Sequence, residues 1–353
     1  MKLSLGSGGN YPYACARVRA KKAALLTKDN YPKLLLMDLN EIGRFLGETQ
    51  YNVEMTELAS RYDGVDLIEL GTSKNLARVY NDILGFTKGE LREMVSSYLA
   101  RWDVWNIKTI LRGKFYGAKI EDIREDLVPA GMLREEALDA LIALESVAEV
   151  LEAVKKLEGI EIPEEVMAEY QTSGRLSAVE DYLDKIYYVR LLEAIDTRSR
   201  PGQLLLAFIR KEIDMTNLIT LLKLKREKVP PERIGTYLIE GGDELTLREL
   251  ERLAATESFE ALVAELNTYS FYEDIKEALE KAKESGSLND VSLAAKKHLM
   301  SRAERFSRLY PLSVLPIIDF MIRKKTEVDN IRIVARCKES GLDPETTKRL
   351  LVT

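Results

Sequence analysis

The chain has 353 residues, of which 46% are hydrophobic and 31% are charged, and its formal net charge is −6. This composition is ordinary for a globular protein, and the acidic balance argues against general nucleic-acid binding because phosphate neutralisation needs a basic surface. Cys15 and Cys337 lack metal-ligand spacing and favour a reduced compartment. No apolar run approaches the roughly 18 residues of a membrane span, and no secretory signal is expected.

In chain order, the pattern predicts helices almost throughout and no strand. A glycine-rich loop at 6–10 comes first and lacks the Gly-Lys-Ser/Thr of a phosphate-binding loop. Long amphipathic helices are expected over 136–158 and 248–266. The expected helix caps are Thr87, Thr246 and Asp343 at helix starts, and Gly113, Gly159, Gly286 and Gly341 at helix ends.

One short pattern occurs three times, at 103–107, 214–218 and 327–331. Each copy has an acid, an apolar residue, a variable residue, Asn and a branched aliphatic residue. The asparagines are 111 and 113 residues apart, a near-constant period that indicates one structural unit used three times. The signature residues are Asp103 and Asn106, Asp214 and Asn217, and Glu327 and Asn330.

The flanks of the three copies support a repeat. An apolar stretch precedes each copy, and a new helix is expected to start after each, at Ile120, Pro231 and Pro344. We therefore predict three helical repeats over 1–128, 129–240 and 241–353. The signature acids are expected to be structural, as N-caps or first-turn residues of helices.

Candidate catalytic chemistry is sparse. The single histidine, His298, lies among lysines and is expected at a surface or boundary position. Glu180, Asp181 and Asp184 could hold Mg²⁺ with a diphosphate, as in all-helical isoprenoid synthases, but such a site needs two opposed acidic motifs and the sequence has no clean second one. We expect no catalytic residue, no cofactor and no metal site.

The whole chain from Tyr11 to Val352 resembles the C subunit of archaeal and vacuolar-type (A-type/V-type) ATP synthases, the counterpart of the d subunit of the vacuolar ATPase. The resemblance rests on the signature, its period and the chain length. It also rests on Tyr310-Pro311-Leu312-Ser313 before 317–323 and on Arg112-Gly113-Lys114 within 106–116.

The resemblance implies a non-catalytic rotor subunit of the central stalk, folded as a pseudo-threefold, all-α funnel with a central cavity. Its expected partners are the shaft subunit with its small companion, received in the cavity, and the membrane proteolipid ring, with no nucleic acid and no nucleotide. Such a socket would lie peripherally at the cytoplasmic face of the membrane and couple shaft rotation to translocation of protons or Na⁺. The alternative is a cytoplasmic helical-repeat adaptor, whose period is usually shorter.

Basic residues near the signature are candidates for contact with the shaft. We hypothesise that the cavity-facing ends of the helical segments before the signature asparagines meet it, including Arg101, Lys211 and Arg323. Charge reversal at these positions should then weaken shaft binding more than reversal of Lys281.

Overall fold

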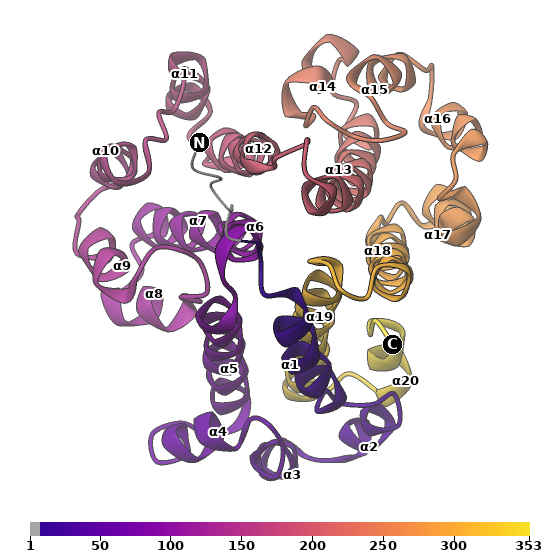
Figure 1. The fold of residues 1–353 in the computed structure, drawn as a ribbon. Coiled ribbons are helices and arrows are strands. Elements are labelled where there is room, and N and C mark those ends of the chain that lie inside the picture. Colours follow the sequence, from indigo (N-terminus) through magenta and orange to yellow (C-terminus); the bar gives the residue numbers. More distant parts are fainter. Residues whose placement is uncertain (1–7) are drawn as a thin grey trace, which may run out of the picture. The chain divides into compact units, whose positions relative to one another are not determined.

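The computed structural model describes residues 8–353, which contain no β-strand, so the predicted all-α class is confirmed (Figure 1). Gly6 and Ser7 of the predicted glycine-rich loop lie outside the described residues. The chain forms two compact units. One comprises residues up to Tyr187 together with Arg323–Leu350, and the other comprises Tyr188–Ile322 with Leu351–Thr353.

The helices follow a similar order three times. After α1 (Tyr11–Ala23), the first series is α2 (Asn30–Leu36), α3 (Leu39–Gly47), α4 (Asn52–Leu58), α5 (Gly64–Phe86), α6 (Gly89–Leu99), α7 (Arg101–Tyr116) and α8 (Ile120–Asp126). The second is α9 (Glu135–Ile142), α10 (Val147–Glu158), α11 (Glu164–Ser173), α12 (Ser177–Ala194), α13 (Arg200–Arg226) and α14 (Pro231–Tyr237). The third is α15 (Leu247–Ala254), α16 (Phe259–Glu265), the 3₁₀ turn η1 (Leu266–Thr268), α17 (Tyr272–Ser285), α18 (Asn289–Leu309), α19 (Leu315–Glu339) and α20 (Pro344–Arg349).

Each copy of the signature lies on the penultimate helix of its series, α7, α13 or α19. The short helix that follows begins at the residue predicted from the sequence, Ile120, Pro231 or Pro344. The repeat boundaries predicted at 128 and 240 fall in the loops after α8 and α14, and the division into three domains stays a prediction.

The prediction of one long amphipathic helix over 136–158 and another over 248–266 is wrong in one respect. Each range contains two helices, α9 and α10 in the first and α15 and α16 in the second. Ser146 accepts a hydrogen bond from the Glu149 amide and starts α10, and Ser258 accepts one from the Ala261 amide and starts α16. A serine side chain competes with the helix ladder for backbone groups, so it favours a new N-terminus where the apolar stripe alone suggests continuity.

The predicted caps are largely confirmed. Thr246 and Asp343 cap α15 and α20 through their side chains. Gly159, Gly286 and Gly341 have positive φ at helix ends. Thr87 is not a cap, because its hydroxyl donates to the carbonyls of Ile83 and Leu84. Gly113 lies inside α7, where a Cβ would approach Cγ1 of Ile123 to 2.4 Å, so this glycine allows close packing of α8 instead of ending a helix.

In the core of the second unit, the apolar face of α13 packs against other helices. Leu218, Leu221 and Leu222 on α13 are fully buried and share one hydrophobic cluster with residues of α15, α16 and α17. Their spacing of three and four residues keeps them on one face of the helix. Among residues 8–353, no helix is long and apolar enough to cross a membrane.

Candidate functional site

The signature asparagines are buried and bind backbone. Asn106 donates to the Val128 carbonyl (2.8 Å) and accepts from the Val128 amide (2.9 Å). Asn217 makes the same pair of bonds with Ile239, both at 2.8 Å and again 22 residues along the chain. Asn330 is also buried and forms a side-chain hydrogen bond with Tyr31. In the first two copies, a buried carboxamide therefore fixes the segment that follows the closing helix.

The signature acids make structural hydrogen bonds, and none of them is an N-cap. Asp103 lies in the first turn of α7, as predicted, whereas Asp214 and Glu327 do not lie in the first turn of a helix. Asp103 accepts hydrogen bonds from the amides of Met132 and Leu133, both at 2.8 Å. Asp214 lies in the middle of α13 and accepts from the amides of Asp243, Glu244 and Leu245, all at 3.0 Å. Glu327 lies in the middle of α19. Each acid holds a loop distant in sequence, which the short-range capping argument could not predict.

The loops held by the acids occupy equivalent places in the three series. The amides of Leu133 and Leu245 belong to the loops that precede α9 and α15. Glu327 accepts from the amide of Leu26, in the loop that precedes α2. The first two acids thus bind the start of the following series, and the third binds the start of the first.

Three lysines complete the pattern, each eight residues after a signature asparagine. Lys114 donates to the Ile142 carbonyl at the end of α9 (2.5 Å), and Lys225 donates to the Ala254 carbonyl at the end of α15 (2.8 Å). Lys338 donates to the Leu35 carbonyl near the end of α2 (2.8 Å). A cation here stabilises the unpaired carbonyls and the negative end of the helix dipole.

Sequence reasoning noted Lys114 within Arg112-Gly113-Lys114 but missed its recurrence as Lys225 and Lys338, and it missed two glycines. Gly131 and Gly242 each follow a signature acid by 28 residues, and a Cβ at either would come within 2.4 Å or less of the acid's Oδ1. The three lysines are 111 and 113 residues apart, which is the spacing of the signature asparagines. The two glycines are 111 residues apart. A search for every residue type that recurs at this period would have found them.

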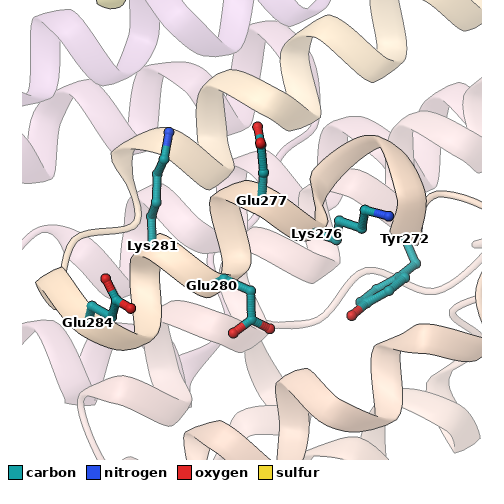
Figure 2. A pocket seen from close by; sticks show the side chains of 6 residues that line it. All are labelled: Tyr272, Lys276, Glu277, Glu280, Lys281 and Glu284. Carbon is teal, nitrogen blue, oxygen red and sulfur yellow. The ribbon is translucent and has the colours of Figure 1, made fainter.

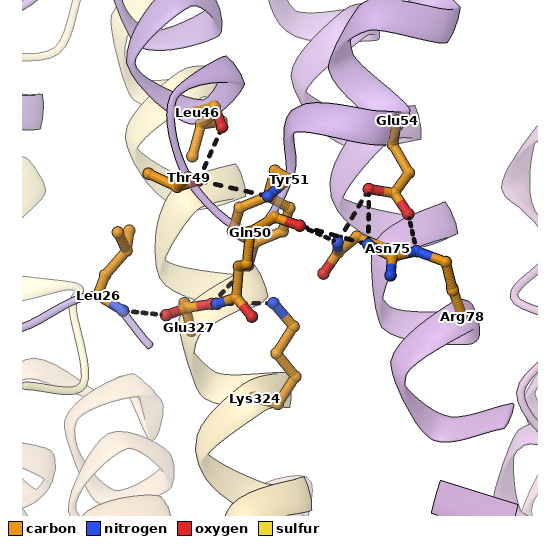
Figure 3. A network of polar contacts seen from close by, with 10 residues as sticks. All are labelled: Leu26, Leu46, Thr49, Gln50, Tyr51, Glu54, Asn75, Arg78, Lys324 and Glu327. Carbon is orange, nitrogen blue, oxygen red and sulfur yellow. Dashed lines mark hydrogen bonds and ion pairs between the residues drawn. The ribbon is translucent and has the colours of Figure 1, made fainter. Parts of the chain in front are cut away.

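The third acid belongs to a buried ionic network (Figure 3). Lys324 Nζ lies 3.0 Å from Glu327 Oε1 and 3.9 Å from the centre of the Tyr51 ring. The Tyr51 hydroxyl (2.6 Å) and the Gln50 amide (2.9 Å) also donate to that carboxylate. Burial lowers the pKa of Lys324 to about 8, against the attraction of Glu327. This network joins α19 to the loop between α3 and α4.

A second polar cluster continues from this loop to α5, as Figure 3 shows. Asn75 donates to the Gln50 carbonyl and to Glu54 Oε2, both at 2.9 Å. Arg78 pairs with Glu54 through two hydrogen bonds. Although burial raises the pKa of Glu54, the bonds from Arg78 and Asn75 outweigh it and hold that pKa below its usual value. The loop between α3 and α4 is therefore fixed to α5 as well as to α19.

Asp214, Asp243 and Glu244 bring their carboxylates close enough together to be considered as metal ligands. Lys211 Nζ, however, lies 2.6 Å from both Asp243 Oδ2 and Glu244 Oε1. Although burial raises the pKa of Glu244, Lys211 and Ser270 hold it at about 2. The ammonium group supplies the positive charge that a cation would bring, so we assign these acids to the loop that Asp214 holds.

The three candidate shaft-contacting residues are all half-buried. The guanidinium of Arg101 lies 3.7 Å from the centre of the Tyr98 ring and donates to the Tyr187 hydroxyl at 2.7 Å. Lys211 is held by Asp243 and Glu244. Arg323 lies on α19. Arg101 and Lys211 therefore already have structural roles within their own units.

The acids of the possible diphosphate motif bind basic side chains of α7. Glu180 is held by Arg112 through two bonds of 2.6 and 2.7 Å, and both oxygens of Asp184 lie 2.7 Å from Lys108 Nζ. These carboxylates join α12 to α7, and such ion pairs would compete with a Mg²⁺–diphosphate ligand.

His298 is buried, whereas a surface or boundary position was predicted. Its ring is buried on α18, with Nδ1 2.6 Å from Asp274 Oδ2 on α17. Burial lowers its pKa in spite of that carboxylate. The neighbouring lysines misled the prediction because adjacent helical positions point to different faces.

A shallow hollow of about 360 Å³ lies on α17 (Figure 2). Its lining is Tyr272, Lys276, Glu277, Glu280, Lys281 and Glu284. Ion pairs between neighbouring turns, such as Lys276 with Glu273, are typical of a solvated helix face.

Asp103 gives a pH prediction, because its burial raises the pKa to about 6 although two backbone amides favour the charged form. The folded state then binds the proton more tightly than the unfolded state. The resulting stabilisation is present below about pH 4 and is lost as the pH rises through about 6. Relative to Asp103→Asn, the wild-type free energy of unfolding should fall by about 3 kcal/mol between about pH 4 and pH 7.

Urea unfolding at a series of pH values measures this difference. Asp214→Asn is the matched control. Burial also raises the Asp214 pKa, but three backbone amides and Lys211 oppose it, so its pH dependence should be smaller. A difference between wild type and Asp103→Asn that stays constant from about pH 4 to pH 7 would contradict the prediction.

Comparison with known proteins agrees with this architecture. Residues 14–350 match the model of the family described as ATP synthase (C/AC39) subunit. The chain is 39% identical over 348 residues to the C subunit of the A-type ATP synthase of Methanococcoides burtonii, covering 98% of this chain and 95% of the relative. It is 39% identical to that of Methanosarcina mazei (97% and 93% covered) and 34% identical to that of Haloferax volcanii (99% of both). The chain therefore belongs to the C/AC39 subunit family of ATP synthases.

Proposed function

We propose that this protein is the central-stalk socket of an A-type ATP synthase. In this role it receives the end of the shaft subunit and rests on the proteolipid ring at the cytoplasmic face of the membrane. It would transmit rotation between them while ions cross the membrane. The predicted funnel of three helical domains would provide the cavity. As a member of its family, the chain is a non-catalytic accessory subunit, not an enzyme.

The observation that supports this role best is the repeated internal bonding of the signature. A subunit that transmits torque must resist deformation, and buried polar bonds between distant segments resist it because breaking one leaves unpaired groups. Asp103, Asp214 and Glu327 each make such bonds to loops that lie far from them in the sequence. Family membership also favours this function over a cytoplasmic adaptor.

Isolation of the complex tests the proposal. The tagged protein should be recovered from native membranes in mild detergent together with the shaft, its small companion and the proteolipid, identified by mass. It should also leave the membrane when peripheral proteins are stripped. Recovery without the shaft and proteolipid subunits would contradict the socket role.

Charge reversal refines the same experiment. Arg101→Glu, Lys211→Glu and Arg323→Glu should each lower the recovered shaft more than Lys281→Glu does. Because Arg101 and Lys211 also bond within their units, each variant is first compared with wild type by circular dichroism and thermal unfolding. Equal shaft recovery from all four folded variants would show that these residues do not make the contact.

A further inference from the structure

The three equivalent junctions differ in how their segments are connected. Asp103 and Asp214 bind loops about 30 residues further along the chain. Glu327 and Leu26 are 301 residues apart, and Lys338 and Leu35 are 303 apart. Both of these contacts lie within the first unit, so its α19 holds a segment from the opposite end of the sequence.

The three signature carboxylates also bind different numbers of backbone amides. Asp103 binds two, those of Met132 and Leu133. Asp214 binds three, those of Asp243, Glu244 and Leu245. The carboxylate of Glu327 binds one backbone amide, that of Leu26, and its other bonds go to the side chains of Gln50, Tyr51 and Lys324.

We propose that residues 26–36, which comprise this loop and α2, form a strap that opens as one unit while the rest of the fold stays closed. Three polar contacts hold the strap on α19: Leu26 with Glu327, Tyr31 with Asn330, and Leu35 with Lys338. Its buried side chains are Tyr31, Leu34 and Leu35. The strap is short, so its opening exposes little apolar surface compared with global unfolding.

The network on its other side stays in place when the strap opens. Tyr51, Gln50 and Lys324 still satisfy Glu327, so loss of the Leu26 bond leaves no buried charge without a partner. Release of the loops before α9 or α15 would instead leave Asp103 or Asp214 without its backbone donors. Detachment of the strap therefore leaves fewer buried charged groups without partners than detachment of either of the other two loops.

Hydrogen exchange with mass spectrometry tests the proposal on the isolated protein. Amides of α2 should exchange faster than those of α9 and α15. Lys338→Met should accelerate exchange in α2 about tenfold, the loss of about one charged hydrogen bond. Exchange in α9 and α15 should not change. The matched variant Lys225→Met should accelerate exchange in α15 about threefold or less, because Asp214 and Asn217 still hold its loop.

Thiol labelling measures the opening of the strap independently, in a protein in which Cys15 and Cys337 are replaced by alanine. Leu35→Cys and Ala254→Cys place a buried thiol at the ends of α2 and α15. The thiol at 35 should react with Ellman's reagent faster, and Lys338→Met should accelerate its labelling by the factor seen in exchange. Equal protection of α2, α9 and α15 in the wild type would overturn the proposal. Acceleration by Lys338→Met spread over the whole chain would overturn it too.

Discussion

Replacement of Glu327 by alanine is expected to lower the free energy of unfolding by about 3–5 kcal/mol, the usual cost of removing one partner of a buried ion pair. Glu327 is 3% exposed and Lys324 is 0% exposed, so the variant leaves an ammonium group in the core without its carboxylate. The Tyr51 ring, 3.9 Å from Nζ, offsets part of this cost through a cation–π contact. Urea unfolding followed by circular dichroism measures the loss.

A double variant distinguishes the charge from the other contacts of Glu327. Lys324→Met with Glu327→Gln removes both charges and keeps an acceptor for Tyr51 and Gln50. We expect it to lose less than half as much stability as Glu327→Ala, because the uncompensated ammonium causes most of the loss. Equal losses in the two variants would show that the ion pair is not the main contribution.

The first copy provides a natural control for this prediction. Ala100 stands three residues before Asp103, where the third copy has Lys324 three residues before Glu327. Asp103→Ala therefore leaves two backbone amides without an acceptor, but it leaves no buried lysine without its carboxylate. We expect it to lower the free energy of unfolding by about 2 kcal/mol. A larger loss for Asp103→Ala than for Glu327→Ala would contradict the account of the buried charge.

Replacement of Gly131 by alanine is expected to destabilise the protein by about 3 kcal/mol through overpacking. The new Cβ would lie 2.1 Å from Oδ1 and 2.7 Å from Oδ2 of Asp103. The carboxylate cannot retreat easily, because it accepts from the amides of Met132 and Leu133. The φ of Gly131 is not positive, so the expected cost comes from the clash and not from backbone strain.

A double-mutant cycle tests whether the clash with the Asp103 carboxylate causes the loss of stability. In an Asp103→Ala background the clashing atoms are gone, and Gly131→Ala should then cost less than about 1 kcal/mol. Gly235→Ala is the control, since nothing apart from its chain neighbours and the backbone of α14 itself lies within 4 Å of its Cβ position. That substitution should be neutral or stabilising by up to about 1 kcal/mol. Additive losses for Gly131→Ala and Asp103→Ala would refute a direct clash.

The helical class and the repeat could be read from local features. Helix stripes, the starts at Ile120, Pro231 and Pro344, and the cap residues Thr246 and Asp343 depend on neighbouring residues, so the sequence predicts them well. Ser146 and Ser258 show the limit: an apolar stripe continues across both, and the break depends on a single side-chain bond that competes with the helix.

The signature was visible in the sequence, but the partners of its residues were not. The near-constant period revealed Asp103, Asp214 and Glu327, yet their bonds reach loops about 30 residues ahead or, for Glu327, 301 residues back along the chain. Burial of Lys324 and His298 likewise depends on what packs over them. Local periodicity specifies which face of a helix is apolar, whereas the partner of a buried polar group is fixed when distant segments pack together.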